Sequence, residues 1–104
     1  MSEITELQAK ISDFADRRKW GVFHTPKNLA MAITGEAGEL AAEFQWLTPE
    51  DAQELDSKKL EAVKMEIADV AIYLLRLCDV LKIDMNSAIQ TKLMINEKRF
   101  PEIK

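Results

Sequence analysis

Apolar residues recur at intervals of three and four along most of this chain, which is the spacing of amphipathic helices. Near the start, Ile4, Leu7 and Ile11 follow this period. The period predicts four helices, over residues 3–18, 26–46, 58–81 and 85–99. Residues 20–24 break it and are expected to form an irregular connection. We therefore expect an all-α fold in a single domain that spans residues 1–104.

Local signals support these helix boundaries. Thr25-Pro26 and Thr48-Pro49 each combine a capping hydroxyl with a proline in the first turn, which is typical of a helix start. The second pair opens a short turn or helix that ends near residue 56. Asp84 is the expected cap of the last helix, which stops before Pro101.

The helix predicted over residues 58–81 is apolar on most sides from residue 67 onward. A helix that is apolar nearly all round has to be buried nearly all round. Three further helices of a chain this small cannot cover it. We therefore expect a four-helix unit that is completed by homo-oligomerisation.

Two acidic pairs stand out, Glu36 with Glu39 and Glu66 with Asp69, each with two residues between its members. At helical pitch, both members of such a pair lie on one face. Apolar neighbours surround each pair, and buried carboxylates are costly unless cations neutralise them. Carboxylate oxygens suit Mg²⁺, with Mn²⁺ as a possible substitute. Glu43 lies on the same stripe as Glu36 and is a possible fifth ligand.

The spacing alone leaves open that these carboxylates are ordinary surface charge. Gly35 and Gly38 favour a site, because glycine costs roughly 1 kcal/mol inside a helix and suggests a close approach by a backbone or ligand. A di-iron centre is disfavoured, because such bundles use Glu-x-x-His motifs and the chain has one histidine, His24. Oxygen ligands alone indicate Mg²⁺ acting on phosphates.

Composition narrows the choice of partners and compartment. The net charge of −4 argues against a nucleic-acid surface. No run of 18 apolar residues indicates a membrane span, and the start of the chain does not read as a signal segment. A single cysteine, Cys78, is typical of a reducing compartment. We expect a cytoplasmic protein.

Several short segments of the sequence together resemble a known protein family. They are Phe23 to Leu29, Gly35 to Leu40, Phe44-Gln45-Trp46, Glu66 to Val70, and the closing Lys92, Asn96, Arg99, Phe100 and Pro101. The chain resembles the MazG-type nucleotide pyrophosphohydrolases, in particular their small dCTP pyrophosphatase-like branch. The resemblance implies an all-α fold assembled as a dimer of dimers. It also implies Mg²⁺-dependent hydrolysis of a nucleoside triphosphate to the monophosphate and pyrophosphate.

The resemblance also suggests roles for individual residues. Glu36, Glu39, Glu66 and Asp69 match the metal-binding positions of the family. Trp20 and Trp46 match tryptophans that line the base pocket, although tryptophans outside apolar runs often serve packing or an interface. His24 is expected near the base, and Lys92 and Asn96 at the triphosphate. Tyr73, four residues beyond Asp69, is expected to hold substrate through its hydroxyl or to pack in the core.

Two other functions remain open from the sequence. The first is a non-catalytic helical module that binds a nucleotide or a partner, with its acidic pairs exposed. The second is a related all-α pyrophosphatase that acts on dUTP or on a damaged purine triphosphate. Base and sugar preference are not fixed by the sequence.

Overall fold

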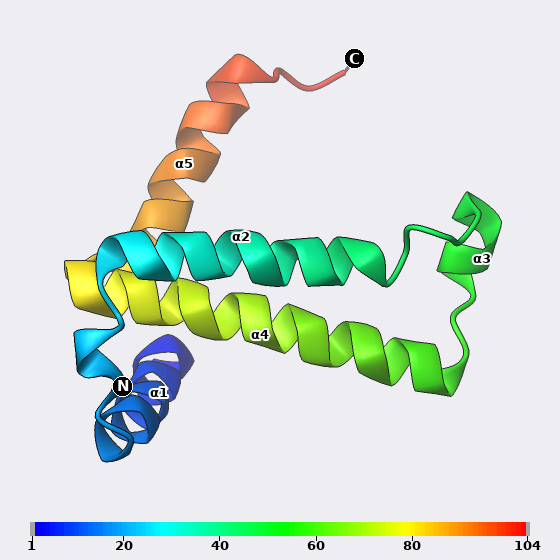
Figure 1. Cartoon of the computed structure of the whole chain (residues 1–104). Coiled ribbons are helices and arrows are strands. Elements are labelled where there is room, and N and C mark those ends of the chain that lie inside the picture. Colours follow the sequence, from blue (N-terminus) through cyan, green and yellow to red (C-terminus); the bar gives the residue numbers. More distant parts are fainter. Residues whose placement is uncertain (1, 104) are drawn as a thin grey trace.

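The computed structural model describes residues 2–103, and within them the chain forms five α-helices and one 3₁₀ helix (Figure 1). These elements are α1 (Glu3–Arg17), η1 (Trp20–Val22), α2 (Pro26–Ala42), α3 (Pro49–Gln53), α4 (Ser57–Leu81) and α5 (Met85–Arg99). The predicted all-α class is confirmed. The connection expected over residues 20–24 contains η1, which Lys19 introduces in a left-handed conformation with φ of 57°.

Side-chain caps fix where the helices begin. The Thr25 hydroxyl accepts a hydrogen bond from the Asn28 backbone N–H at 3.3 Å, directly before Pro26. The Asp56 carboxylate accepts from the Lys59 N–H at 2.7 Å and starts α4. Each cap satisfies a backbone donor that has no partner inside the helix. These local bonds explain why the predicted starts were accurate to about one residue.

The predicted end of the second helix at Trp46 was wrong, because α2 ends at Ala42. After that residue the chain continues in tight turns, in which the Phe44 N–H bonds the Ala41 carbonyl at 3.0 Å. Pro49 holds Thr48 in an extended conformation, with ψ of 160°, so the helix cannot run through to α3.

The core lies where three helices meet. α2 and α4 run antiparallel along each other, and α1 packs against α4 (Figure 1). Gln8 of α1 adds a hydrogen bond to the Leu75 carbonyl of α4 at 3.1 Å. Among residues 2–103 the buried apolar side chains are few: Ala15, Leu29, Val63 and Leu75. This small core fixes the two central helices side by side, which is what positions the site.

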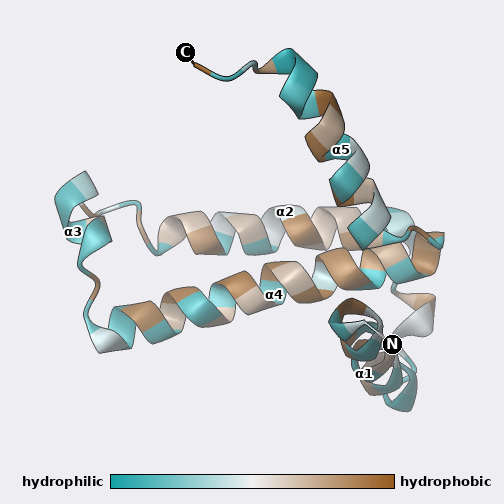
Figure 2. Cartoon of the chain, turned by 180° about the vertical axis from the view of Figure 1, so that it is seen from behind, coloured by the Kyte–Doolittle hydropathy of each residue, from teal (hydrophilic) through white to brown (hydrophobic). Residues whose placement is uncertain are grey.

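Much apolar surface stays outside this core. Figure 2 shows hydrophobic residues along the whole length of α4 and again on α5. On α4, Met65, Ile67 and Ile72 are all more than two-fifths exposed. The prediction that this helix has more apolar surface than one chain can bury is therefore met within the described residues.

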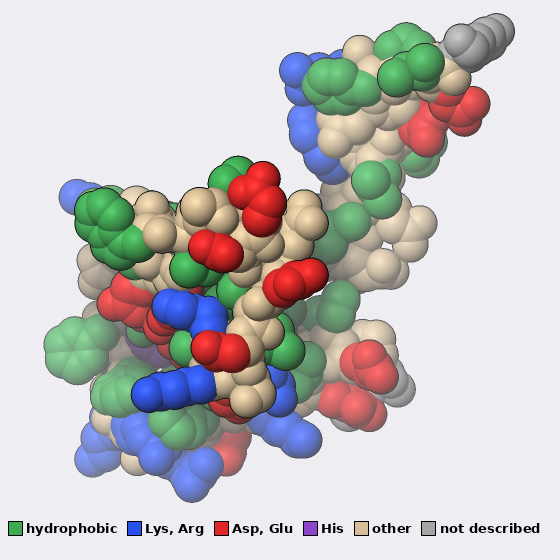
Figure 3. Space-filling model, turned by 90° about the vertical axis from the view of Figure 1, so that its right-hand side faces the viewer, with side chains coloured by type: hydrophobic (Ala, Val, Ile, Leu, Met, Phe, Trp, Pro, Cys, Tyr) green, Lys and Arg blue, Asp and Glu red, His purple; other side chains and the backbone are tan. Residues whose placement is uncertain are grey.

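α5 stands away from the paired helices (Figures 1 and 3). It begins beside the end of α4 but does not pack along α2 or α4. The four long helices predicted from the sequence are thus present, with α3 as a short fifth, but they do not close into a bundle within one chain. No helix among residues 2–103 combines the length and apolarity needed to cross a bilayer.

Candidate functional site

Three carboxylates converge between the two central helices. Glu36 and Glu39 lie in the C-terminal half of α2, and Glu66 lies in the N-terminal half of the antiparallel α4. One oxygen of each lies within 4.8 Å of the others. The spacing of three residues puts Glu36 and Glu39 on the same face of α2, and the packing of α2 on α4 brings Glu66 to it. The site therefore depends on the fold as well as on the motif.

Two of these carboxylates have oxygens that are hidden from water. Among residues 2–103, neither Glu36 Oε2 nor Glu66 Oε2 has a hydrogen-bond partner. Burial raises the pKa of Glu36, and the nearby charges of Glu39 and Asp69 raise it further. Burial likewise raises the pKa of Glu66, with Glu39 and Asp69 adding to the effect. The cluster is thus short of positive charge.

These observations fit a divalent cation. Buried polar atoms are normally paired, so unpaired carboxylate oxygens that face one another suggest a missing positive ligand. The donors are all hard oxygens, the set that Mg²⁺ and Mn²⁺ prefer. Ordinary surface charge would instead be solvated, which the two buried oxygens are not.

Two further acids border the cluster. Asp69 is exposed, one turn beyond Glu66 on α4, and is near enough for its charge to raise the pKa of both Glu36 and Glu66. Glu43, the possible fifth ligand, is already paired, because Lys59 Nζ lies 2.9 Å from its Oε1. This ion pair joins the end of α2 to the start of α4 instead.

Gly35 and Gly38 do not have the packing role expected of them inside one chain. A Cβ added at either would meet no atom within 4 Å. The helix-destabilising glycines therefore leave open space at their own positions, and no backbone among residues 2–103 fills it.

An aromatic hollow lies next to the acidic cluster. It has a volume of about 290 Å³ and is lined by Trp20, Phe23, His24, Asn28, Leu29, Ala32 and Tyr73. The ring centroids of Trp20 and His24 are 6.0 Å apart, and those of His24 and Tyr73 are 6.5 Å apart. Because Ala32 precedes Glu36 by one turn and Tyr73 follows Asp69 by one turn, the hollow adjoins the carboxylates. Of the predicted substrate residues, Trp20, His24 and Tyr73 are brought together.

The other three predicted substrate residues lie elsewhere in the chain. Trp46 is 88% exposed. It lies beyond the C-terminal end of α2, whereas Trp20 lies before the N-terminal end. The 17 residues of α2 correspond to about 25 Å, so one base cannot contact both tryptophans of the same chain. Lys92 and Asn96 are on α5, which does not pack along α2 or α4. For these three residues a role at the site stays a prediction and requires a second copy.

Arg76 was not among the site residues predicted from the sequence. Its side chain is buried in α4, and its Nε–H donates to His24 Nδ1 at 3.1 Å. The signal was present in the sequence, since an arginine in the middle of an apolar helix needs a partner. The partner lies 52 residues earlier in the chain and was not predictable from spacing.

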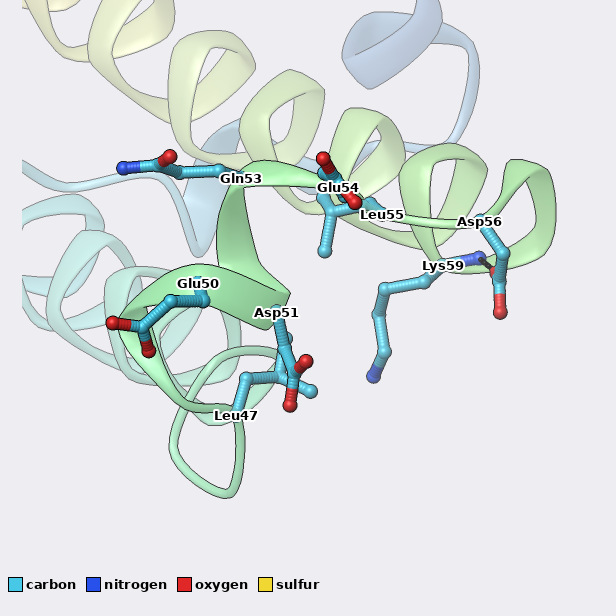
Figure 4. Close-up of a pocket in the computed structure, with 8 residues that line it drawn as sticks. All are labelled: Leu47, Glu50, Asp51, Gln53, Glu54, Leu55, Asp56 and Lys59. Carbon is cyan, nitrogen blue, oxygen red and sulfur yellow. Dashed lines mark hydrogen bonds between the residues drawn. The ribbon is translucent and has the colours of Figure 1, made fainter.

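A second hollow, of about 550 Å³, lies between α3 and the start of α4 (Figure 4). Its polar lining is mostly acidic: Glu50, Asp51, Glu54 and Asp56, with Gln53 and Lys59. Figure 4 shows these carboxylates pointing in different directions rather than toward one point. The hollow therefore lacks the convergent groups of a binding site.

This chain is similar to known proteins. dCTP pyrophosphatase 1 of Homo sapiens is 38% identical over 103 residues, which is 97% of this chain and 59% of the relative. The Mus musculus protein of the same name is also 38% identical with the same coverage. The chain thus spans about three-fifths of the length of these curated relatives.

A solved structure is also similar. A pyrophosphatase from Archaeoglobus fulgidus superimposes with a TM-score of 0.91 at 40% sequence identity, over 98% of this chain and 95% of that one. The model of the MazG-like family matches residues 31–104, which include both acidic pairs. The resemblance predicted from the sequence is confirmed, and the chain belongs to the MazG-like family.

Proposed function

We propose that this chain, as one domain over residues 1–104, is a Mg²⁺-dependent nucleoside triphosphate pyrophosphohydrolase. Its expected substrate is dCTP or a related deoxynucleoside triphosphate, and its products are the monophosphate and pyrophosphate. The observation that carries the proposal is the pair of buried, unpaired carboxylate oxygens beside an aromatic hollow. The names of the relatives, dCTP pyrophosphatase 1, support the same substrate class.

Glu36, Glu39, Glu66 and Asp69 would hold the metal. When bound, Mg²⁺ screens the triphosphate charge and lowers the pKa of coordinated water, which makes a hydroxide available near neutral pH. The carboxylates supply its oxygen ligands from two helices. Burial and then mutual repulsion raise the pKa of Glu36 and Glu66, and a bound cation would offset both effects.

The reaction forms a bond between a water oxygen and the α-phosphorus and breaks the bond from that phosphorus to the bridging oxygen. Pyrophosphate leaves with the electron pair of that bond, and a carboxylate accepts the proton of the water. Glu39 is our choice for this base, because it is in the cluster and remains exposed. Lys92 of a second copy would offset charge on the leaving phosphates, and Asn96 of that copy would donate a hydrogen bond to the triphosphate.

The base would lie in the hollow against Trp20, His24 and Tyr73. Aromatic faces stack on any nucleobase, so these rings hold the base while the carboxylates act on the phosphates one turn away. Trp46 would reach a base only from another subunit, since it is at the other end of α2.

We also propose that the chain works as a homo-oligomer, with a dimer of dimers favoured. Its accessible surface is 8423 Å², whereas a folded monomer of its 11.9 kDa mass is expected to expose about 6,000 Å². Its radius of gyration is 16.7 Å, against about 13 Å for a compact domain of this length. A second copy that packs against α4 and α5 would account for both differences.

Amide variants test the site directly. Glu39→Gln and Asp69→Asn each remove one charged oxygen ligand at nearly constant volume, so hydrolysis of dCTP should be lost while helicity is kept. Glu61→Gln, an exposed change on α4, is the matched control and should keep full activity. Full activity in the Asp69→Asn protein, or turnover in excess chelator, would contradict the metal assignment.

A substrate panel separates the alternatives. Faster turnover of dUTP or of an oxidised purine triphosphate would assign the second enzyme class. Nucleotide binding with no release of phosphate or pyrophosphate would favour the non-catalytic module.

A further inference from the structure

The hydrogen bond between Arg76 and His24 determines the state of the imidazole. Arg76 Nε–H donates to His24 Nδ1 at 3.1 Å. A guanidinium has only donors, so Nδ1 must be the unprotonated, accepting nitrogen. A neutral imidazole carries one N–H, which is then on Nε2.

Arg76 is well placed to hold this state. The residue is 8% exposed, and its Nη1 lies 3.9 Å from Asp79 Oδ2 one turn later on α4. Burial lowers the pKa of His24, and the guanidinium lowers it further, which favours the neutral ring that the hydrogen bond requires. Protonation of Nδ1 would place an N–H against the Arg76 donor, which the geometry opposes.

His24 is also part of the wall of the aromatic hollow. Its ring lies between Trp20 and Tyr73, with centroids at 6.0 and 6.5 Å. Because Nδ1 is occupied by Arg76, the polar atom that the ring has left for a ligand is Nε2–H.

We propose that Arg76 is a positioning residue that fixes His24 as its Nε2–H tautomer, so that His24 offers one hydrogen-bond donor to an acceptor on the nucleobase. This inference rests on the proposed function and deepens it. Cytosine presents two adjacent acceptors, its ring N3 and its O2, whereas uracil and thymine carry an N–H at ring position 3. A fixed donor that meets ring position 3 favours cytosine, because uracil and thymine would place an N–H against it.

The tautomer can be measured without any nucleotide. His24 is the only histidine of the chain, so the imidazole signals of ¹⁵N-labelled protein belong to it alone. In a two-bond ¹H–¹⁵N correlation spectrum above pH 6.5, we expect a protonated Nε2 and an unprotonated Nδ1. A proton on Nδ1, or rapid averaging of the two nitrogens, would overturn the proposal.

Variants test the role of Arg76. In Arg76→Met the proton should exchange between the two ring nitrogens, so that their ¹⁵N signals average. Arg76→Lys keeps a charged donor and should restore part of the bias toward Nε2–H. Arg17→Met removes an exposed arginine of α1 and is the control, which should leave the spectrum unchanged. A fixed Nε2–H in a folded Arg76→Met protein would show that Arg76 is not the cause. If Arg76→Met does not fold, the spectra of the wild type and of Arg76→Lys decide whether Arg76 sets the tautomer of His24.

Binding tests whether the donor is used. Gln at position 24 can place an amide N–H near the former Nε2, whereas Asn reaches only to the former Nδ1. We expect the KM of His24→Asn for dCTP to exceed that of His24→Gln by roughly 2- to 13-fold, the value of one hydrogen bond. Equal KM values would overturn the donor role. A wild-type protein with the expected tautomer but no activity on any nucleotide would instead contradict the proposed function.

Discussion

Replacing Leu93 of α5 with glutamate should dissociate the protein. α5 has 15 residues and does not pack along α2 or α4. Helices of this length are marginal in water on their own. The apolar side chains of α5 are nevertheless exposed: Ile89 51%, Leu93 58%, Met94 69% and Ile95 46%. We therefore expect another copy of the chain to cover this helix.

The surface area gives the size of the effect. The chain exposes 8423 Å², roughly 2,400 Å² more than a compact monomer of its mass would. A standard interface uses about 800 Å² of each partner, so the excess suffices for a permanent assembly. Fully burying a leucine contributes about 1.5–3 kcal/mol. A two-fold interface contains two such leucines, so their loss should weaken dimerisation roughly 10²- to 10⁴-fold.

Sedimentation velocity with circular dichroism measures both consequences. The wild-type protein should sediment as a dimer or tetramer at micromolar concentration, and Leu93→Glu should shift toward the 11.9 kDa monomer. Its helical signal should fall by up to about a fifth, the share of α5 among the α-helical residues. Gln53→Glu adds the same charge at an exposed polar position and should change neither result. A wild-type monomer with full helicity would refute the reasoning.

Three further predictions concern the base pocket, the acidic cluster and the core. Trp46→Ala should keep the melting temperature of the wild type, because the side chain is 88% exposed. It should raise the KM for dCTP about 5- to 150-fold through loss of one stacking contact. An unchanged KM would mean that the base is bound elsewhere. Without metal, the pKa values of Glu36 and Glu66 are raised above 4.5 in the folded protein. The contribution of these two groups to stability is therefore complete below pH 4.5 and is lost as the pH rises through their folded-state pKa values. Melting temperatures measured across this range should therefore fall more steeply in the wild type than in the Glu36→Gln/Glu66→Gln protein, and equal slopes would contradict the burial of these carboxylates. Leu29→Ala should lower the free energy of unfolding by about 2–5 kcal/mol in urea titrations, since Leu29 is only 1% exposed, and a loss below about 1 kcal/mol would show that this site can collapse.

What could be predicted from the sequence was mostly local. Thr25 and Asp84 cap their helices through bonds three residues away, so each start was readable from a few letters. The two acidic pairs also depend on local pitch. The meeting of Glu66 with Glu36 and Glu39 followed from one added assumption, that the two helices pack antiparallel.

What could not be predicted depends on distant contacts. The bonds from Arg76 to His24 and from Lys59 to Glu43 join residues 52 and 16 positions apart, and no periodicity specifies either pair. The position of α5 likewise has no local signal, because its apolar residues do not specify which surface they would pack against. The assignments of Trp46, Lys92 and Asn96 to the site stay predictions for that reason.

The most direct measurement follows the oxygen of water into the products. Purified protein is incubated with dCTP and Mg²⁺ in ¹⁸O-labelled water, and both products are analysed by mass spectrometry. We expect one ¹⁸O atom in the monophosphate and none in the pyrophosphate, with no turnover when chelator replaces the metal. Label in pyrophosphate, release of inorganic phosphate alone, or full turnover in chelator would contradict metal-dependent attack on the α-phosphorus by this acidic cluster.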